Sequence, residues 1–127
     1  MDRLNSSFQE FAYIRYEVEQ FLNAQHSRLA SPAELLVLAD NSLELVQGFT
    51  RSRAQLLEAV EHLPPVLPYK FNSSAFAWER VGQSLDALDQ IAFQNRGVPG
   101  RKNVVWVAVL PLCIWTLQYS GQTLSRS

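Results

Sequence analysis

The sequence has a single cysteine, so it cannot form an internal disulfide or a zinc site built on several cysteines. It also has no excess of charge of either sign: 11 Lys and Arg stand against 12 Asp and Glu, a formal net charge of -1. A protein that binds nucleic acid through the phosphates needs a basic surface, which this balance does not supply. We therefore expect no nucleic-acid partner.

Long apolar runs and familiar catalytic patterns are missing as well. The longest apolar run, from Val104 to Trp115, is interrupted by Pro111 and is too short to cross a bilayer, so we expect no membrane span. No apolar segment of the secretory type precedes the first predicted helix. The sequence has no G-x-S-x-G elbow, glycine-rich phosphate loop or H-E-x-x-H pattern, and we expect His26 and His62 to lie at helix ends. We therefore predict no catalytic residues and no enzymatic activity.

What the chain does have is a composition suited to one packed domain, with 47% hydrophobic and 18% charged residues. Apolar residues recur at three- and four-residue steps over residues 7–26, which predicts an amphipathic helix capped by Asn5, Ser6 or Ser7. The residues expected on its buried face are Phe8, Phe11, Ile14, Val18, Phe21 and Leu22.

Two more helices are predicted further along the chain. The second opens at Thr50 or Ser52 and ends at Pro64, where a long proline-rich loop to residue 72 begins. The third opens at Ser73 or Ser74 and ends near Gly97. Their expected buried positions are Ala54, Leu57, Val60 and Leu63 in the second helix, and Trp78, Val81, Leu85, Leu88 and Ala92 in the third.

Short apolar runs between these helices predict strands. After a break at Ser31 and Pro32, "AELLVLAD" predicts a strand covered on both faces, and "LELVQGFT" predicts its less buried hairpin partner. A later strand is predicted in "NVVWVAVL", whose Trp106 packs between sheet and helix. The mixed order favours an α/β fold, with residues 1–4 as the carboxyl end of another strand. The alternative is a helical protein in which the first and last of these runs are core helices.

Four stretches, "DRLNSSFQEFAYIR", "LELVQGFTRSRAQLLEAVEHL", "SLDALDQIA" and "VPGRKNVVWV", resemble in this order the von Willebrand factor type A-like domains of many bacterial proteins. The resemblance implies a doubly wound (Rossmann-like) sheet flanked by helices, incomplete here at its N- and C-terminal ends. It also implies an adhesion or protein-binding role, with a divalent metal at the carboxyl edge of the sheet. The partial domain covers residues 1–109.

The metal loop of this family reads D-x-S-x-S, and its oxygens suit Mg²⁺. The resemblance places Asp2, Leu4 and Ser6 at these positions, so an apolar residue replaces the middle hydroxyl. We expect a degenerate metal-ion-dependent adhesion site, with Asp2 and Ser6 as the remaining ligands of a Mg²⁺ cofactor and Asn5 as a neighbouring binding residue. The alternative is that Asp2 and Ser6 cap the first helix.

Two further features lie toward the C-terminus. Arg101 and Lys102, before the last predicted strand, are candidate binding residues for an anion or a partner. The similarity stops at Val107, and residues 110–127 form an atypical tail that a reading-frame change or gene break would explain. The expected function is a protein-binding or scaffolding module with a protein partner. The alternative is a small helical interaction or regulatory protein without enzymatic activity.

Overall fold

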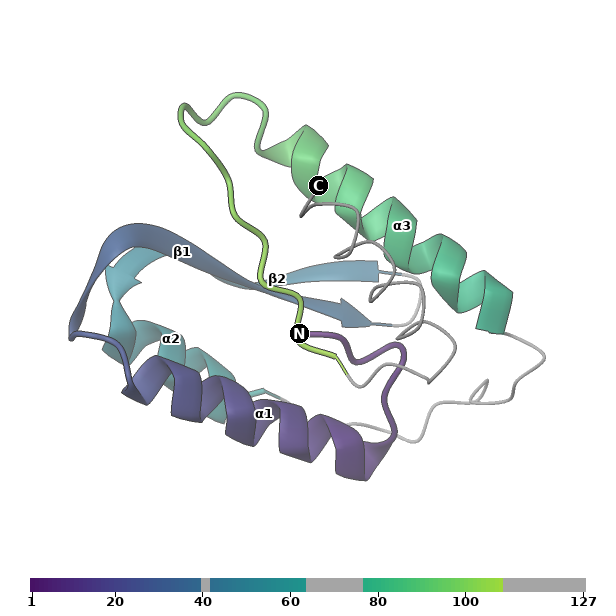
Figure 1. Cartoon of the computed structure of the whole chain (residues 1–127), viewed down its shortest axis with the longest axis horizontal. Helices are drawn as coiled ribbons and strands as arrows, with labels where there is room; N and C mark the ends of the chain where they lie inside the picture. The colour runs from purple at the N-terminus through teal and green to yellow at the C-terminus, as the bar shows by residue number, and fades with distance from the viewer. Residues whose placement is uncertain (40–41, 64–76, 109–127) are drawn as a thin grey trace, which may run out of the picture.

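The computed structural model describes residues 1–39, 42–63 and 77–108. Within them the chain forms three helices and an antiparallel hairpin (Figure 1). The predicted proline-rich loop, the capping residues of the third helix and the tail lie outside the described residues. The elements, in chain order, are α1 (Phe8–Asn23), β1 (Arg28–Ala39), β2 (Ser42–Ser52), α2 (Arg53–Glu61) and α3 (Ala77–Gln94).

Helix α1 begins at a complete capping box. The Ser7 hydroxyl accepts the backbone N–H of Glu10, and a carboxylate oxygen of Glu10 accepts the Ser7 N–H at 2.7 Å. Ser7 is thus the cap among the three predicted candidates, and the alternative that Asp2 and Ser6 cap this helix is wrong. Four of the six residues expected to be buried are in the core, whereas Phe8 and Phe21 are 57% and 56% exposed because they flank the stripe that faces the hairpin. The four are Phe11, Ile14, Val18 and Leu22.

The β1–β2 hairpin is confirmed, which excludes the helical alternative for "AELLVLAD". The predicted break at Ser31 and Pro32 is wrong, because β1 runs through both residues from Arg28. Proline has no N–H for the ladder, and the pairing register shifts on either side of Ala33, where the strand is irregular. The proline therefore disturbs the pairing locally without ending the strand.

The N-terminal segment extends the hairpin by backbone hydrogen bonds. Asp2 forms a parallel bridge with Leu38, and the Leu38 N–H donates to Met1 while its carbonyl accepts from Arg3, both at 2.9 Å. On its other side, the Asp2 N–H donates to the Val107 carbonyl at 2.9 Å. The chain around Val107 therefore passes beside the N-terminal segment (Figure 1).

The predicted last strand is not formed over its described residues, 103–108, which have no strand assignment. The sheet proper has two strands, so the described residues show a mixed α/β arrangement and no doubly wound sheet.

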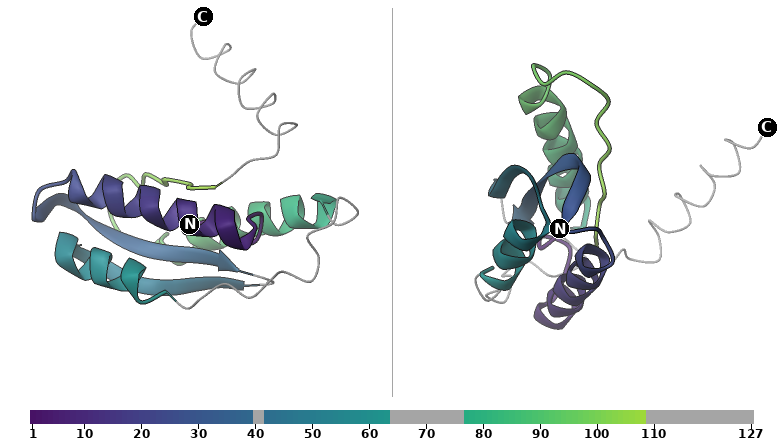
Figure 2. Two further views of the ribbon diagram at one scale, coloured as in Figure 1. Left: turned by 90° about the horizontal axis from the view of Figure 1, so that it is seen from below. Right: turned by 90° about the vertical axis from the view of Figure 1, so that its left-hand side faces the viewer.

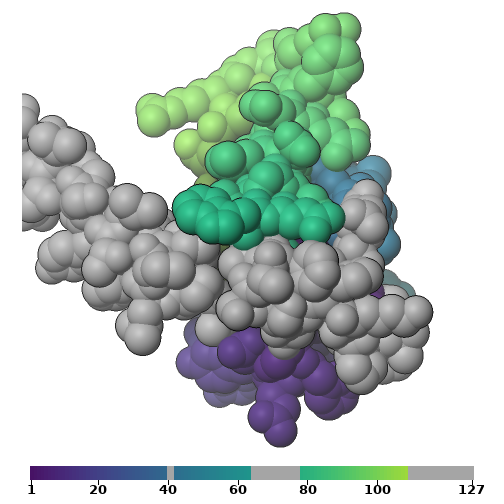
Figure 3. Space-filling model, turned by 90° about the vertical axis from the view of Figure 1, so that its right-hand side faces the viewer, coloured from purple at the N-terminus to yellow at the C-terminus, as the bar shows by residue number. Residues whose placement is uncertain are grey.

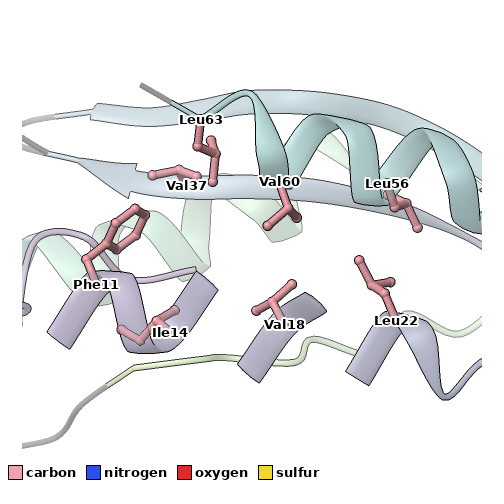
Figure 4. Close-up of a cluster of buried hydrophobic side chains, with 8 residues drawn as sticks. All are labelled: Phe11, Ile14, Val18, Leu22, Val37, Leu56, Val60 and Leu63. Atoms are coloured by element: carbon pink, nitrogen blue, oxygen red, sulfur yellow. The ribbon is translucent and has the colours of Figure 1, made fainter. Parts of the chain in front are cut away.

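Helices cover both faces of the hairpin near the carboxyl end of β1 (Figure 2). Val37 points into a core with α1 and α2, while its neighbour Leu38 packs on the opposite face with Leu4 and with Ala87 of α3. Adjacent strand residues face opposite sides, so both helical layers use one strand. The predicted coverage of this strand on two faces is confirmed at its buried end. Figure 4 shows the first core, which consists of Phe11, Ile14, Val18, Leu22, Val37, Leu56, Val60 and Leu63.

Helix α2 presents a slightly different face from the predicted one. Ser52 is its cap, since the Ser52 hydroxyl accepts the N–H of Gln55 at 3.3 Å. Ala54, predicted to be buried, is exposed, and Leu56, which is not among the predicted positions, is buried in the core with the α1 residues. Val60 and Leu63 are buried as predicted.

Helix α3 differs most from the prediction. The stripe expected to be buried is largely at the surface: Trp78 is 85% exposed and Leu85 is 59% exposed. The sheet side of α3 instead carries smaller or polar side chains, Ser84, Ala87 and Asn95, the last donating its amide to Glu34 of β1 at 3.2 Å. Short side chains let the helix lie close to the hairpin, and Trp106 fills the space beside Ala87 as predicted.

Candidate functional site

The residues predicted to form the metal site lie together at one edge of the hairpin. Asp2 and Ser6 are 1% and 2% exposed, and Asn5 lies half-buried between them. Because the segment from Met1 runs parallel to β1, and Asp2 pairs with Leu38 near the end of β1, the site sits at the carboxyl edge of both segments. This is the edge at which open α/β sheets bind ligands.

The Asp2 carboxylate accepts three N–H groups from the protein. One oxygen, Oδ1, accepts the backbone N–H of Asn5 at 3.0 Å. The other, Oδ2, accepts the Asn5 side-chain amide at 2.7 Å and the Trp106 indole N–H at 3.1 Å. Charge-assisted hydrogen bonds of this kind are the stronger ones in proteins. The buried carboxylate therefore joins the first loop to the segment that carries Trp106.

The Ser6 side chain also takes part in this hydrogen-bond network. Its hydroxyl donates to the Asp2 carbonyl at 2.7 Å, which closes the turn between the N-terminal segment and α1. Leu4, at the position of the missing hydroxyl, is 1% exposed and packs with Leu38 and Ala87. The replacement is thus part of the core on the α3 side.

Ser84 of α3 completes the cluster. The Asn5 amide donates to the Ser84 hydroxyl at 3.2 Å, and that hydroxyl donates to the Arg80 carbonyl one turn earlier at 2.8 Å. The loop is thus bonded to residues that are distant in the sequence. Asn5 and Ser84 are 79 positions apart, and Asp2 and Trp106 are 104 positions apart. Sequence analysis missed both as polar partners, because no local pattern marks a serine inside a helix or an indole N–H as part of a site.

A second charge lies near this carboxylate. The α-amino group of Met1 donates to the Leu36 carbonyl at 3.0 Å. Burial lowers the pKa of this amino group from its usual value of 8.0, and the negative charge of Asp2 opposes that shift to a smaller extent.

Arg101 and Lys102 are not part of this cluster. The Lys102 ammonium donates to the carbonyls of Val98, Pro99 and Gly100, so it closes the turn after α3, where Gly100 has a φ of +95°. Arg101 is exposed. Four residues separate Lys102 from Val107, whose carbonyl accepts the Asp2 N–H, and five extended steps span roughly 16 Å.

The histidines lie where the sequence predicts. His62 caps the end of α2 and its Nδ1 lies 2.8 Å from the Glu58 carbonyl, while His26 is exposed just beyond α1. Over residues 1–39, 42–63 and 77–108, no cluster of three or more His, Cys, Asp or Glu side chains is arranged to hold a metal ion. The same part of the chain has no helix both long and apolar enough to span a membrane.

Comparison of the chain with protein-family models, with curated proteins and with solved structures finds no match. The geometry above is therefore the basis for the functional proposal.

Proposed function

We propose that this chain is a protein-binding or scaffolding module of the von Willebrand factor A-like type, without enzymatic activity. The observation that carries the proposal is the position of the loop from Asp2 to Ser6. It follows a segment paired in parallel with β1 and stands at the carboxyl edge, between helices on the two faces of the hairpin. Open α/β folds bind their partners at this edge.

The finer fold assignment belongs to the same proposal. Backbone hydrogen bonds order four chain segments side by side: β2, β1, residues 1–4 and residue 107. A doubly wound (Rossmann-like) sheet would use these as neighbouring strands, with the segment from Met1 as a central one and a hairpin at one edge. The backbone contacts support this order, and the wider sheet is our proposal.

A binding role suits the carboxylate better than a catalytic one. The Asp2 oxygens already accept three N–H groups, which leaves about one of the carboxylate's four lone-pair positions for a substrate proton, and the side chain is buried. The half-buried Asn5 and Trp106, by contrast, lie at the rim of the cluster, where a partner can reach them. We assign binding to the two half-buried residues at this rim, Asn5 and Trp106.

The resemblance also implies a Mg²⁺ ion, which the donor set here does not fit. A hard cation needs oxygen lone pairs, yet Leu4 has none in its side chain and the Asp2 oxygens face N–H donors. We propose that the indole of Trp106 and the amide of Asn5 take the place of the cation by stabilising the negative charge of the carboxylate through hydrogen bonds. The module would then bind its partner without a metal.

The test is site-specific photo-crosslinking. A photoreactive amino acid replaces Arg3, a half-buried residue next to the cluster, and a matched variant carries it at the exposed Gln90 of α3. We expect a discrete protein adduct at position 3 in cells that express the chain, and its loss when excess purified chain competes. The same adducts at both positions, or none at position 3, would overturn the proposal.

A further inference from the structure

The apolar stripe of α3 is the largest feature that the packing of the described residues leaves unexplained. We define this stripe as Trp78, Val81, Leu85, Leu88 and Ala92. Trp78, Leu85 and Leu88 are 85%, 59% and 40% exposed, and Val81 is half-buried. At 100° per residue these five positions form one continuous face of the helix. Figure 3 views the molecule from the end where α3 begins and shows its first turns (teal) standing at the surface.

The stripe is separate from the face that α3 packs on the hairpin. Ser84 and Ala87 face the hairpin side, and their centre lies about 110° round the helix from the centre of the stripe. A helix that packs one face of small side chains on the sheet and carries a second face of large apolar residues has the pattern of a helix with two partners. A contiguous exposed apolar face marks an interaction surface.

The chain itself supplies a candidate for the second partner. Trp106 packs against the cluster that includes Ala87 of α3, so the chain passes this helix two residues before the described part ends at residue 108. The sequence then continues for 19 residues, 109–127 (127 − 108 = 19), whose only charged side chain is Arg126. Fully extended, this segment reaches roughly 60 Å, whereas α3 is about 27 Å long, so its length does not limit contact with any part of the stripe.

The composition of this segment matches the stripe. It contains Leu110, Leu112, Ile114, Trp115 and Leu117, and it has no acidic residue to meet the three carboxylates of α3. Covalent attachment also holds the segment at a high effective concentration, on the order of millimolar, which a separate chain at micromolar concentration does not reach.

We propose that residues 109–127 cover the apolar stripe of α3 in the same molecule. This gives the atypical tail a structural role. The inference is independent of the binding role proposed above. It concerns a different surface, the α3 stripe, and the burial of that stripe within one chain.

The single native cysteine, Cys113, lies in the tail and makes the proposal testable in the full chain. Leu85→Cys and Leu88→Cys each add a second thiol on the stripe, at exposed positions where the fold tolerates change. Gln90→Cys is the matched control, because it is also exposed but lies about 140° round the helix from Leu85. Each variant is oxidised with diamide at low protein concentration, and products are separated without reductant and identified by mass spectrometry of the linked peptides.

We expect an intramolecular disulfide to Cys113 in the two stripe variants, formed at least about tenfold faster than in Gln90→Cys because the tail raises the local thiol concentration at the stripe. Equal rates in all three variants, or no intramolecular product, would overturn the proposal. Disulfide-linked dimers in the stripe variants, together with a dimer in size-exclusion chromatography of the original chain, would assign the stripe to a second copy instead.

Discussion

The two faces of the β1–β2 hairpin are held in different ways. On the α1–α2 face, eight buried apolar side chains interdigitate (Figure 4). On the α3 face, the described residues bury the apolar side chains of Leu4, Leu38 and Ala87, with Leu43 and Trp106 packed against them, and side-chain hydrogen bonds add further links. One helical layer is thus attached mainly by apolar burial and the other mainly by directional polar contacts.

This difference indicates which face contributes most to the free energy of unfolding and which face positions the loop that carries Asp2. Apolar burial is non-directional and provides most of the favourable free energy of folding. A hydrogen bond adds only about 1 kcal/mol net, but it fixes two groups in register. The α1–α2 face is therefore expected to dominate the free energy of unfolding, whereas the α3 face positions the loop that carries Asp2.

The strongest test of this comparison is a pair of phenylalanines on α1. Phe11 is 2% exposed and Phe8 is 57% exposed, although both lie on the same helix. Phe11→Ala should lower the free energy of unfolding by about 3–5 kcal/mol, through lost burial and the cavity left behind. Phe8→Ala should cost under about 1 kcal/mol, because little buried area is lost. Urea unfolding followed by circular dichroism measures both, and equal losses would show that this face is not the main core.

The second test removes the charge at the centre of the polar face. Asp2→Asn keeps the shape of the side chain but sets an amide N–H₂ against N–H donors from Asn5 and Trp106. We expect a loss of about 1.5–3 kcal/mol, the usual range for hydrogen bonds to charged groups.

The matched control is Asp89→Asn, an exposed carboxylate on α3, which should change stability by less than about 0.5 kcal/mol. If Asp2→Asn were as mild as its control, the carboxylate would not be the link that joins the first loop to residue 106.

The tryptophan gives an intermediate case. Trp106→Phe removes one of the three N–H donors to the Asp2 carboxylate and should lower the free energy of unfolding by about 1 kcal/mol.

The same contrast explains how far the sequence alone could predict the fold. The α1 stripe and the hairpin were predictable, because helical periodicity and short apolar runs report directly on local structure. The orientation of α3 was not, since periodicity identifies an apolar face without saying what covers it. Trp78 and Leu85 were accordingly assigned to the core but lie at the surface, while Ser84, which gave no apolar pattern, faces the site.

The candidate site was predicted only in part, for a related reason. Asp2, Asn5 and Ser6 are neighbours in the sequence, and the structure brings them together with every one hydrogen-bonded to another. The contributions of Ser84 and Trp106 depend on the tertiary fold, which brings distant segments to one edge of the hairpin.

A smaller effect should appear in the pH dependence of stability. The buried amino group of Met1 has a lowered pKa in the folded chain, so between that pKa and 8.0 the unfolded state binds more protons. Stability should therefore rise with pH across this window and level off above it, with a slope of at most about 1.4 kcal/mol per pH unit for one proton. Urea unfolding between pH 6 and 9, in a His26→Gln, His62→Gln, Cys113→Ser background, measures this dependence. A fall in stability over the same range would contradict the assignment.

The smallest expected effect is that of added metal ions on the melting temperature, for which we expect no change. This test distinguishes a carboxylate stabilised by hydrogen bonds from one that holds a cation. A ligand that binds only the folded state must raise the melting temperature, by an amount that grows with its concentration. If the donors of Asn5 and Trp106 stand in for the ion, Mg²⁺ or Mn²⁺ up to millimolar concentration should leave the melting temperature of the original chain unchanged relative to a chelator control. Leu4→Ser restores an oxygen at the middle position of the loop, but it also leaves a cavity beside Leu38 and Ala87, so its own melting temperature without metal is the reference. A metal-dependent rise in the original chain would show that the cation competes successfully with the indole and the amide, and the metal-free version of the binding module would then be wrong.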